Sequence, residues 1–269
     1  MGSNPLIYPH MKPDLPIFKA ETAYTSLTIE QKGGQLLLRT DGDALQSVIN
    51  QQNPQILALK NLRSLMGILL FLPPPERICL LGTGGGSLIH FLRFHYPKSH
   101  ITAVEIDHEL LEIMHAKMSL PRADDLLTYV IDDASHFIDT SEQKFDLIIA
   151  DLFLGIQSPP WLLQSASMHR LNAMLTDTSG LCYNLVIDSE VDFKAFYANL
   201  RTVFQQKTLC LPVEGLDNTI AFALRHQPED LEMAEYMQKA FELSDQHDSN
   251  YMEVLSAIYA TNPVGSGII

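Results

Sequence analysis

RICLLGTGGGS, residues 77–87, is the stretch that decides the fold of this 269-residue chain. A strand-like apolar run leads directly into a turn that contains four glycines, and a helical stretch opens at Ser87. Glycines let the backbone approach a ligand closely, and free N–H groups at a helix start favour anionic or carboxylate groups. The first strand-to-helix turn of a doubly wound sheet faces the ligand crevice, so we expect a binding site at this turn.

Strand-like and helical stretches alternate around the glycine turn. Near-continuous apolar strands, each followed by a crossover helix, indicate a parallel sheet covered on both faces, and right-handed crossovers make it doubly wound. The sequence therefore predicts an α/β fold with a mostly parallel, Rossmann-like sheet, closed by an antiparallel hairpin of 208–211 and 218–224. The further strands are ITAVEID (101–107), LLTYVID (126–132), FDLIIAD (145–151) and LCYNLVI (181–187), and the expected helices are 56–72, 88–95, 109–118 and 160–174.

An N-terminal β-hairpin region, residues 1–55, precedes this α/β domain, which we place at residues 56–226. Ser26–Glu30 alternates between polar and apolar residues, and Gln35–Arg39 reads as a second strand after a Gly-Gly turn. Asp41-Gly42 is a further turn signal. The region therefore predicts a small antiparallel appendage.

An acidic C-terminal extension, residues 227–269, predicts two helices. Its apolar residues keep helical spacing: Leu231, Ala234, Met237 and Phe241, then Met252, Leu255, Ile258 and Tyr259. The two helices either pack on the domain with a solvated acidic face or form an acidic lid or partner surface.

Composition excludes several classes of protein. Apolar residues make up 46% of the chain and charged residues 19%, which supports a sizeable core and argues against a disordered chain. A formal net charge of -14 argues against nucleic acid as a partner. Three widely spaced Cys make no disulfide framework or zinc site, and neither a signal peptide nor a membrane span is visible. We therefore expect a cytoplasmic protein without membrane contact.

Acidic residues end the strands that follow the glycine turn. Glu105 ends the second strand, Asp132-Asp133-Ala134 ends the third, and Asp151 ends the fourth. A carboxylate after the second strand can accept both hydroxyls of a ribose, in a dinucleotide and in S-adenosylmethionine alike. The other acids would repel a pyrophosphate, whereas a sulfonium cation gains from them. The pattern therefore favours a sulfonium nucleoside over a dinucleotide.

These motifs together resemble the spermidine synthase (polyamine aminopropyltransferase) family, and more narrowly its bacterial spermidine synthase-like branch of methyltransferases. The resemblance covers about residues 25–226 and implies a fold of the class I S-adenosylmethionine-dependent methyltransferase type. It rests on the joint pattern of DGDALQS (41–47), RICLLGTGGGSLIHFLRFHYP (77–97), AVEID (103–107), SLPRADD (119–125), IDDASHFI (131–138), FDLIIADLF (145–153), NLVI (184–187) and NTIAFAL (218–224).

The resemblance implies a role for each matching residue. Glycines 82, 84 and 86 would cradle the tail of S-adenosylmethionine, of its decarboxylated form or of methylthioadenosine. Glu105 would hold the ribose, Ile106 would flank the adenine, and Asp133 would bind the adenine amino group. Gln46 would reach the ligand from the N-terminal region. The complete predicted cofactor site is Gln46, Gly82, Gly84, Gly85, Gly86, Glu105, Ile106, Asp132, Asp133, Ala134 and Asp151, and Asp151 is the predicted catalytic residue.

Three departures from the family pattern remove the amine half of the site. Gly85 stands where spermidine synthases carry an Asp that contacts the aminopropyl amine. Leu154 stands where they carry the second acid of an Asp-x-x-Asp-Pro motif, which helps deprotonate the attacking amine, and Leu62 lies near the place of a lost aromatic residue. An alkylammonium has a pKa near ~10 and must lose a proton before it attacks, and loss of a positioned base typically costs ~10²–10⁴-fold in rate.

Three functions remain open from the sequence. The first is a transferase that uses S-adenosylmethionine, most simply a methyltransferase, acting on an unknown small acceptor that is either cationic or neutral. The second is a diverged polyamine aminopropyltransferase, and the third is a non-catalytic homologue that binds a nucleoside or a partner. The resemblance also implies a homodimer, because relatives associate and the N-terminal β region offers an edge.

Four residues near the predicted crevice have more than one interpretation. His136 either lines the crevice or is a hydrogen-bonding wall residue, and the His spacing predicts no metal site. Asp188 and Glu190 either replace the missing acid or are ordinary loop acids. Trp161 either caps the acceptor pocket or anchors its loop to the core.

Overall fold

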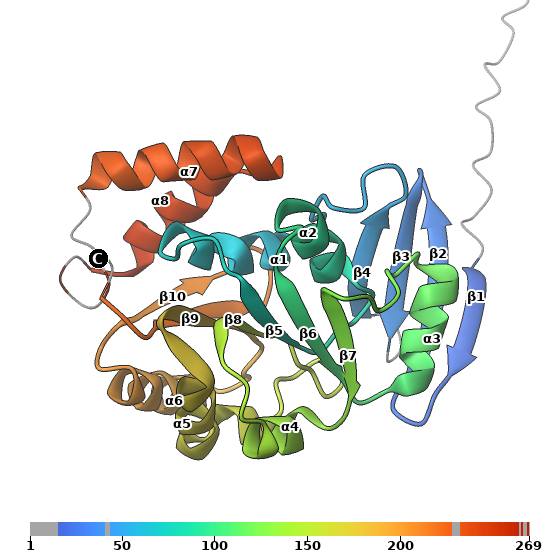
Figure 1. Ribbon diagram of the computed structural model, residues 1–269, viewed down its shortest axis with the longest axis horizontal. Coiled ribbons are helices and arrows are strands. Elements are labelled where there is room, and N and C mark those ends of the chain that lie inside the picture. Colours follow the sequence, from blue (N-terminus) through green and yellow to red (C-terminus); the bar gives the residue numbers. More distant parts are fainter. Residues whose placement is uncertain (1–15, 41–43, 228–231, 264, 266–267, 269) are drawn as a thin grey trace, which may run out of the picture.

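A central seven-stranded sheet organises the computed structural model, which describes residues 16–40, 44–227, 232–263, 265 and 268 (Figure 1). Its strands are β5 (Arg77–Leu81), β6 (His100–Glu105), β7 (Leu127–Ile131), β8 (Phe145–Ala150), β9 (Leu175–Leu185), β10 (Thr208–Pro212) and β11 (Thr219–Leu224). They lie in the order β10-β11-β9-β8-β5-β6-β7. The pairings among β5 to β9 are parallel, and the β10–β11 hairpin joins β9 antiparallel. The predicted mostly parallel, class I methyltransferase-type α/β fold is confirmed.

Helices cover both faces of this sheet (Figure 1). One face carries α1 (Lys60–Leu65), the 3-10 helix η1 (Met66–Leu70), α2 (Ser87–His95), α3 (His108–Lys117), α7 (Met233–His247) and α8 (Tyr251–Thr261), and the other carries α4 (Ala134–Thr140), α5 (Ser165–Met174) and α6 (Glu190–Val203). β5 shows how one strand serves both cores. Ile78 and Leu80 point into the first core, whereas Cys79 and Leu81 point into the second, as the twofold alternation of a strand requires.

The helices differ in places from those the sequence predicts. The expected helix 56–72 is only α1 followed by η1, and a Cβ on Gly67 would lie 2.6 Å from Val254 Cγ1 of α8, so packing fixes the backbone there. A short 3-10 helix, η2 (Pro160–Leu163), precedes α5. Neither α4 nor α6 is predicted. Among the described residues no helix is both long and apolar enough to cross a membrane.

A four-stranded antiparallel sheet forms the N-terminal appendage. Its strands are β1 (Pro16–Glu21), β2 (Ser26–Lys32), β3 (Gln35–Thr40) and β4 (Ala44–Asn50), in sequential order. The two predicted strands are β2 and β3, whose alternate residues are buried, whereas β1 and β4 are not predicted. The expected turn at Asp41-Gly42 lies outside the described residues. Thr22 hydrogen-bonds to Asp107, the N-cap of α3, and joins this sheet to the larger one.

The C-terminal extension forms two helices, as predicted, but α7 buries a different face. Met237 is 46% and Phe241 66% exposed, while Tyr236, Ala240 and His247 are buried. The aromatic side chains decide the orientation, because Tyr236 packs against Phe71 with ring centroids 5.5 Å apart. The expectation that Ala234, Met237 and Phe241 form the packed face is therefore wrong, and Leu231 lies outside the described residues.

A buried histidine joins α7 to α2. The His247 ring lies 4.9 Å from the Phe91 ring and 4.6 Å from the His95 ring, centroid to centroid. Its Nδ1 shares a hydrogen bond of 2.8 Å with the Tyr251 hydroxyl, and its Nε2 lies 3.4 Å from the Tyr96 hydroxyl. Burial, with a smaller contribution from His95, lowers the pKa of His247 from 6.5 to about 3. His247 is therefore neutral in the folded protein near neutral pH.

Acidic pH should destabilise the folded protein, because His247 is protonated more readily in the unfolded chain. The unfolded chain protonates this side chain below about pH 6.5 and the folded chain only near pH 3. The contribution of neutral His247 to the free energy of unfolding is therefore complete above pH 6.5 and is lost as the pH falls. We expect the free energy of unfolding, measured by urea titration, to fall by about 2 kcal/mol from pH 7 to pH 5. His247→Phe should flatten this pH dependence and His100→Phe, at an exposed position, should not. An equal slope in His247→Phe and wild type would contradict the assignment.

Candidate functional site

The glycine turn lies between β5 and α2 and touches the end of β8. Gly82 has a φ of 86°, and a Cβ there would lie 2.4 Å from the backbone oxygen of Asp151, so only glycine fits. A Cβ on Gly84 would meet only Gln46 Oε1 of β4, at 3.6 Å. The turn is therefore an open cradle with Gln46 at its rim, and the structure brings these four predicted residues together.

Gly85 packs against the N-terminal sheet. A Cβ on Gly85 would lie 2.4 Å from Ser47 Cβ and 2.6 Å from Ser47 Oγ. Ser47 is 3% exposed, and its hydroxyl lies 3.0 Å from that of Ser87 in the first turn of α2. Ser47 therefore fills the space that a side chain at position 85 would enter, and Gly86, the N-cap of α2, completes the turn.

Glu105 lies at the end of β6, only 9% exposed, and is oriented by the glycine turn. Its Oε2 accepts hydrogen bonds from Thr83 N at 3.0 Å and Thr83 Oγ1 at 2.8 Å, and its Oε1 accepts one from Asp107 N at 3.1 Å. A carboxylate has about four acceptor positions, so about one remains for a ligand hydroxyl. Ile106, beside it, is 38% exposed and can flank a ring.

Two aspartates follow β7 at the start of α4. Asp133 caps the helix, and its Oδ1 accepts from Ser135 N at 2.7 Å and from Ser135 Oγ, bonds that lower the pKa of Asp133 and leave Oδ2 for another donor. Asp132 accepts a hydrogen bond from His136 Nδ1 at 2.8 Å and raises the pKa of His136. Sequence reasoning did not find this acid partner of His136. Ala134 is buried in the second core.

Asp151 directly follows β8 and is held by an amide chain. Asn184 Nδ2 donates to Asp151 Oδ1 at 2.9 Å, and Asn218 Nδ2 donates to Asn184 Oδ1 at 2.8 Å. Because Asn184 accepts from Asn218, its NH₂ group must face Asp151, where it favours the ionised carboxylate. Burial is the larger effect and raises the pKa of Asp151 to about 6. Sequence reasoning missed Asn184 and Asn218 as site residues; a lone amide in each of two apolar strand runs was the available signal.

The loop after β8 has no second carboxylate at position 154, where the motif of the similar family has one. Leu154 is 66% exposed and pairs through its backbone with Gln157, at 2.8 Å and 3.3 Å. The Gln157 side chain binds Asp188, which follows β9. Ser158 is tied to Val186 by bonds of 3.1 Å and 3.0 Å, so the loop is fixed to the end of β9.

The two remaining candidates, Glu190 and Trp161, make their contacts with residues other than Asp151. Glu190 begins α6, is exposed, and forms an ion pair of 2.6 Å with Lys194. Trp161 packs against the second core, and its carbonyl accepts from Ser167 Oγ at 2.7 Å, which favours anchoring of the loop over capping a pocket. In the part of the chain that the structure describes, no three His, Cys, Asp or Glu side chains are grouped to hold a metal ion.

Direct contacts bring the predicted residues together at the carboxyl ends of the parallel strands. Thr83 of the glycine turn binds Glu105, Gly82 abuts Asp151, and Asp132 N donates to the Glu105 carbonyl at 3.1 Å. The carboxyl ends of parallel strands form the ligand crevice of such sheets. The arrangement can hold a cationic nucleoside against carboxylates from three strands and can take up a proton at Asp151.

Comparisons with known proteins identify the spermine/spermidine synthase family and also find similar methyltransferases. Residues 63–206 match the family model of the spermine/spermidine synthase domain. The polyamine aminopropyltransferase of Neisseria meningitidis serogroup A is 26% identical over 246 residues, which are 91% of this chain and 93% of the relative.

Two solved structures extend the comparison. A probable spermidine synthase from Corynebacterium glutamicum has a TM-score of 0.73 at 20% identity and covers 94% of this chain and 97% of its own, which shows a shared fold. Human methyltransferase-like protein 13, in complex with SAH, has a TM-score of 0.59 at 27% identity and covers 71% of this chain and 90% of its own.

Proposed function

This chain belongs to the spermine/spermidine synthase domain family, and we propose from this premise that it binds S-adenosylmethionine and transfers its methyl group to a small acceptor. One observation carries the proposal. The nucleoside cradle keeps its acids, whereas the loop after β8 presents Asp151 alone, with Leu154 66% exposed where the family motif has its second acid.

The residues of the cradle fit S-adenosylmethionine. Glu105, Asp133 and Asp151 are carboxylates at the carboxyl ends of β6, β7 and β8, which suits a sulfonium cation joined to a neutral adenosine. Gly84 leaves open space beside Gln46 Oε1 for the ligand's tail. When bound, S-adenosylmethionine supplies an activated methyl group. The human relative in complex with SAH supports this class of ligand.

Asp151 orients the acceptor and can take up its proton. Asn184 holds Oδ1, so Oδ2 is the atom that faces other partners. With a pKa of about 6, the carboxylate is largely ionised at pH 7 and accepts a proton more readily than an ordinary aspartate. Methyl transfer also gains from proximity and in-line orientation, so one positioned carboxylate is sufficient for this chemistry.

Aminopropyl transfer to a diamine has less support from these contacts. The diamine needs carboxylates to bind and deprotonate it, and Leu154 offers none. Asp188 already accepts from Gln157, and Ser47 fills the space beside Gly85. The cofactor half of the family site is therefore kept and the amine half is not.

A diverged polyamine aminopropyltransferase is the second candidate. The observation that favours it is the length of the match, since 91% of this chain aligns with 93% of the Neisseria meningitidis enzyme. In that case Asp151 alone would bind and deprotonate the amine.

We infer that the protein works in the cytoplasm as a homodimer. The two protomers pair through an edge of the N-terminal sheet, where β1 and β4 are the outer strands. Its units are residues 1–55, 56–226 and 227–269. Light scattering after size exclusion would measure the mass that tests the dimer.

The co-product identifies the reaction. Purified protein is incubated with S-adenosylmethionine and the small-molecule fraction of a bacterial extract, and separately with decarboxylated S-adenosylmethionine and putrescine. We expect S-adenosylhomocysteine in the first reaction, reduced in Asp151→Asn but not in the control Asp192→Asn on the surface of α6. Methylthioadenosine in the second reaction alone would favour the aminopropyltransferase, and neither product would mean a non-catalytic homologue.

A further inference from the structure

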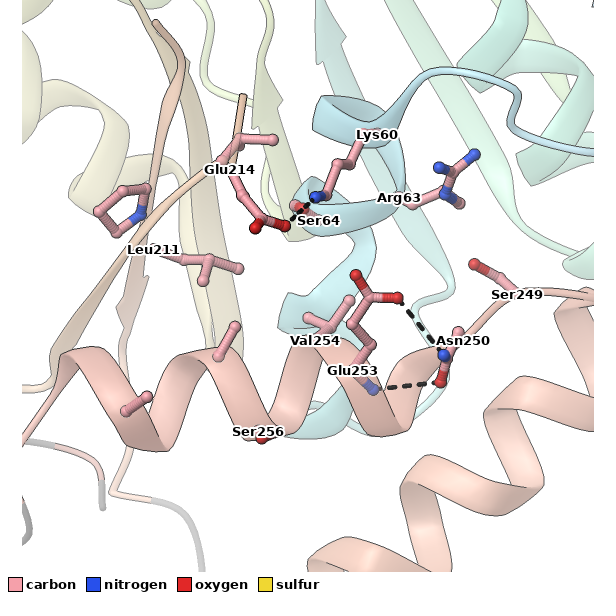
Figure 2. A pocket seen from close by; sticks show the side chains of 14 residues that line it. Lys60, Arg63, Ser64, Leu211, Glu214, Ser249, Asn250, Glu253, Val254 and Ser256 are labelled. Carbon is pink, nitrogen blue, oxygen red and sulfur yellow. Dashed lines mark hydrogen bonds and ion pairs between the residues drawn. The ribbon is translucent and has the colours of Figure 1, made fainter. Parts of the chain in front are cut away.

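A cavity of about 370 Å³ lies between α1, the end of β10 and α8 (Figure 2). Its volume is within the range of small-molecule sites. Leu211, Val213 and Val254 are buried and supply an apolar wall, and Ala257 and Ala260 leave room because their side chains are small. No residue of the candidate nucleoside site lines this cavity. It is therefore a separate place on the molecule.

Two cations on α1 line one side of the cavity. Lys60 Nζ is paired with Glu214 Oε2 at 2.8 Å. Arg63 Nη1 donates to the carbonyl oxygens of Leu57 and Ala58, at 3.0 Å and 2.7 Å. These two bonds fix the guanidinium and leave its Nε and Nη2 N–H groups for a further acceptor.

A carboxylate on α8 faces these cations. Figure 2 shows the Glu253 side chain pointing from α8 toward α1, with Arg63 beyond it and Glu214 at the opposite end. Its Oε2 accepts from Asn250 Nδ2 at 3.4 Å, and the described part of the chain gives it no ion pair. The cavity thus has one fixed cation and one carboxylate that are not paired with each other, beside an apolar wall.

We propose that this cavity is a second small-molecule site, which takes an amino-acid zwitterion with an apolar side chain. The ligand carboxylate binds the free N–H groups of Arg63, and its ammonium group binds Glu253. The apolar side chain packs against Leu211 and Val254. A ligand with only one of the two charges forms only one of the two charge-assisted contacts and therefore binds more weakly.

The position of the site gives it a route to Asp151. Glu214 and Asn218 belong to one turn, in which Val213 N donates to the Asn218 carbonyl at 2.8 Å. The Asn218 side chain holds Asn184, which holds Asp151. The turn that brings Glu214 to the cavity wall therefore connects through Asn218 and Asn184 to the carboxylate that the proposed methyl transfer uses, although ligand binding does not depend on that function.

Calorimetry with three related probes tests the site. L-leucine carries both charges, isocaproate has the same side chain without the ammonium group, and isoamylamine lacks the carboxylate. We expect saturable one-to-one binding of L-leucine to the wild-type chain and binding at least about tenfold weaker for each analogue. No saturable heat with L-leucine, or equal binding of either analogue, would overturn the proposal.

Two substitutions assign the binding to this cavity. Glu253→Gln removes the charge at an exposed position and should weaken L-leucine binding about tenfold. Ala257→Leu fills the cavity without removing a charge and should abolish binding. The matched control Glu242→Gln, on the exposed surface of α7, should bind as the wild type does. Unchanged L-leucine binding in both cavity variants, with their melting temperatures preserved, would place the ligand elsewhere and contradict the site.

Discussion

Glu105→Ala protein is expected to bind S-adenosylmethionine about 2–4 kcal/mol more weakly than wild type, which is roughly 30- to 1000-fold. The substitution removes an ionised acceptor of the ribose, and it also releases Thr83, whose backbone and side chain both donate to this carboxylate. Calorimetry measures the loss. Thr83→Val, which removes only the hydroxyl, should cost less than Glu105→Ala.

The control for this experiment is Glu142→Ala, an exposed acid between α4 and β8. It should leave the affinity unchanged. If Glu105→Ala kept the wild-type affinity while its circular dichroism spectrum was preserved, the ribose assignment would be wrong, although the fold would stand.

Spermidine formation should be the other large effect. From putrescine and decarboxylated S-adenosylmethionine, we expect the wild-type chain to work at least about 10²-fold more slowly than the Neisseria meningitidis relative assayed beside it, because Leu154 provides no second carboxylate. Leu154→Asp should raise the rate, and Leu154→Asn, which adds polarity without charge, should not.

The packing of Gly85 refines this test. An aspartate at position 85 collides with Ser47, so Gly85→Asp should add activity to Leu154→Asp only when Ser47→Gly is introduced as well. Spermidine formation at the relative's rate by the unmodified chain would contradict the loss of the amine half and would favour Asp151 as a sufficient base.

The sheet and its crevice were predictable because each signal is local. Apolar runs 77–81, 101–105 and 145–150 end at a glycine or an acid, and parallel strands bring those ends to one edge. β1 and β4 lack such a clear signal, since their partners are set by pairing in the appendage. The buried face of α7 could not be predicted from residue spacing. Ring contacts place Tyr236 and His247 in the core and leave Met237 and Phe241 exposed.

The amide chain behind Asp151 depends on tertiary contacts. Asn184 lies on β9, and Asn218 precedes β11, which pairs with β9 in a register that places Ile220 opposite Asn184. No local pattern joins two asparagines 34 residues apart. Likewise, the sequence shows that Gly85 lacks the family's acid but not that Ser47, from another sheet, occupies its space.

Paired calorimetric titrations with S-adenosylmethionine and its decarboxylated form test the proposed chemistry most directly. Gly85 and Ser47 place no carboxylate beside the ligand's tail, so the intact ligand, which carries its own carboxylate, is not repelled. We predict that S-adenosylmethionine binds at least as tightly as the decarboxylated form. A tenfold preference for the decarboxylated form, about 1.4 kcal/mol, would contradict methyl transfer and point to aminopropyl transfer.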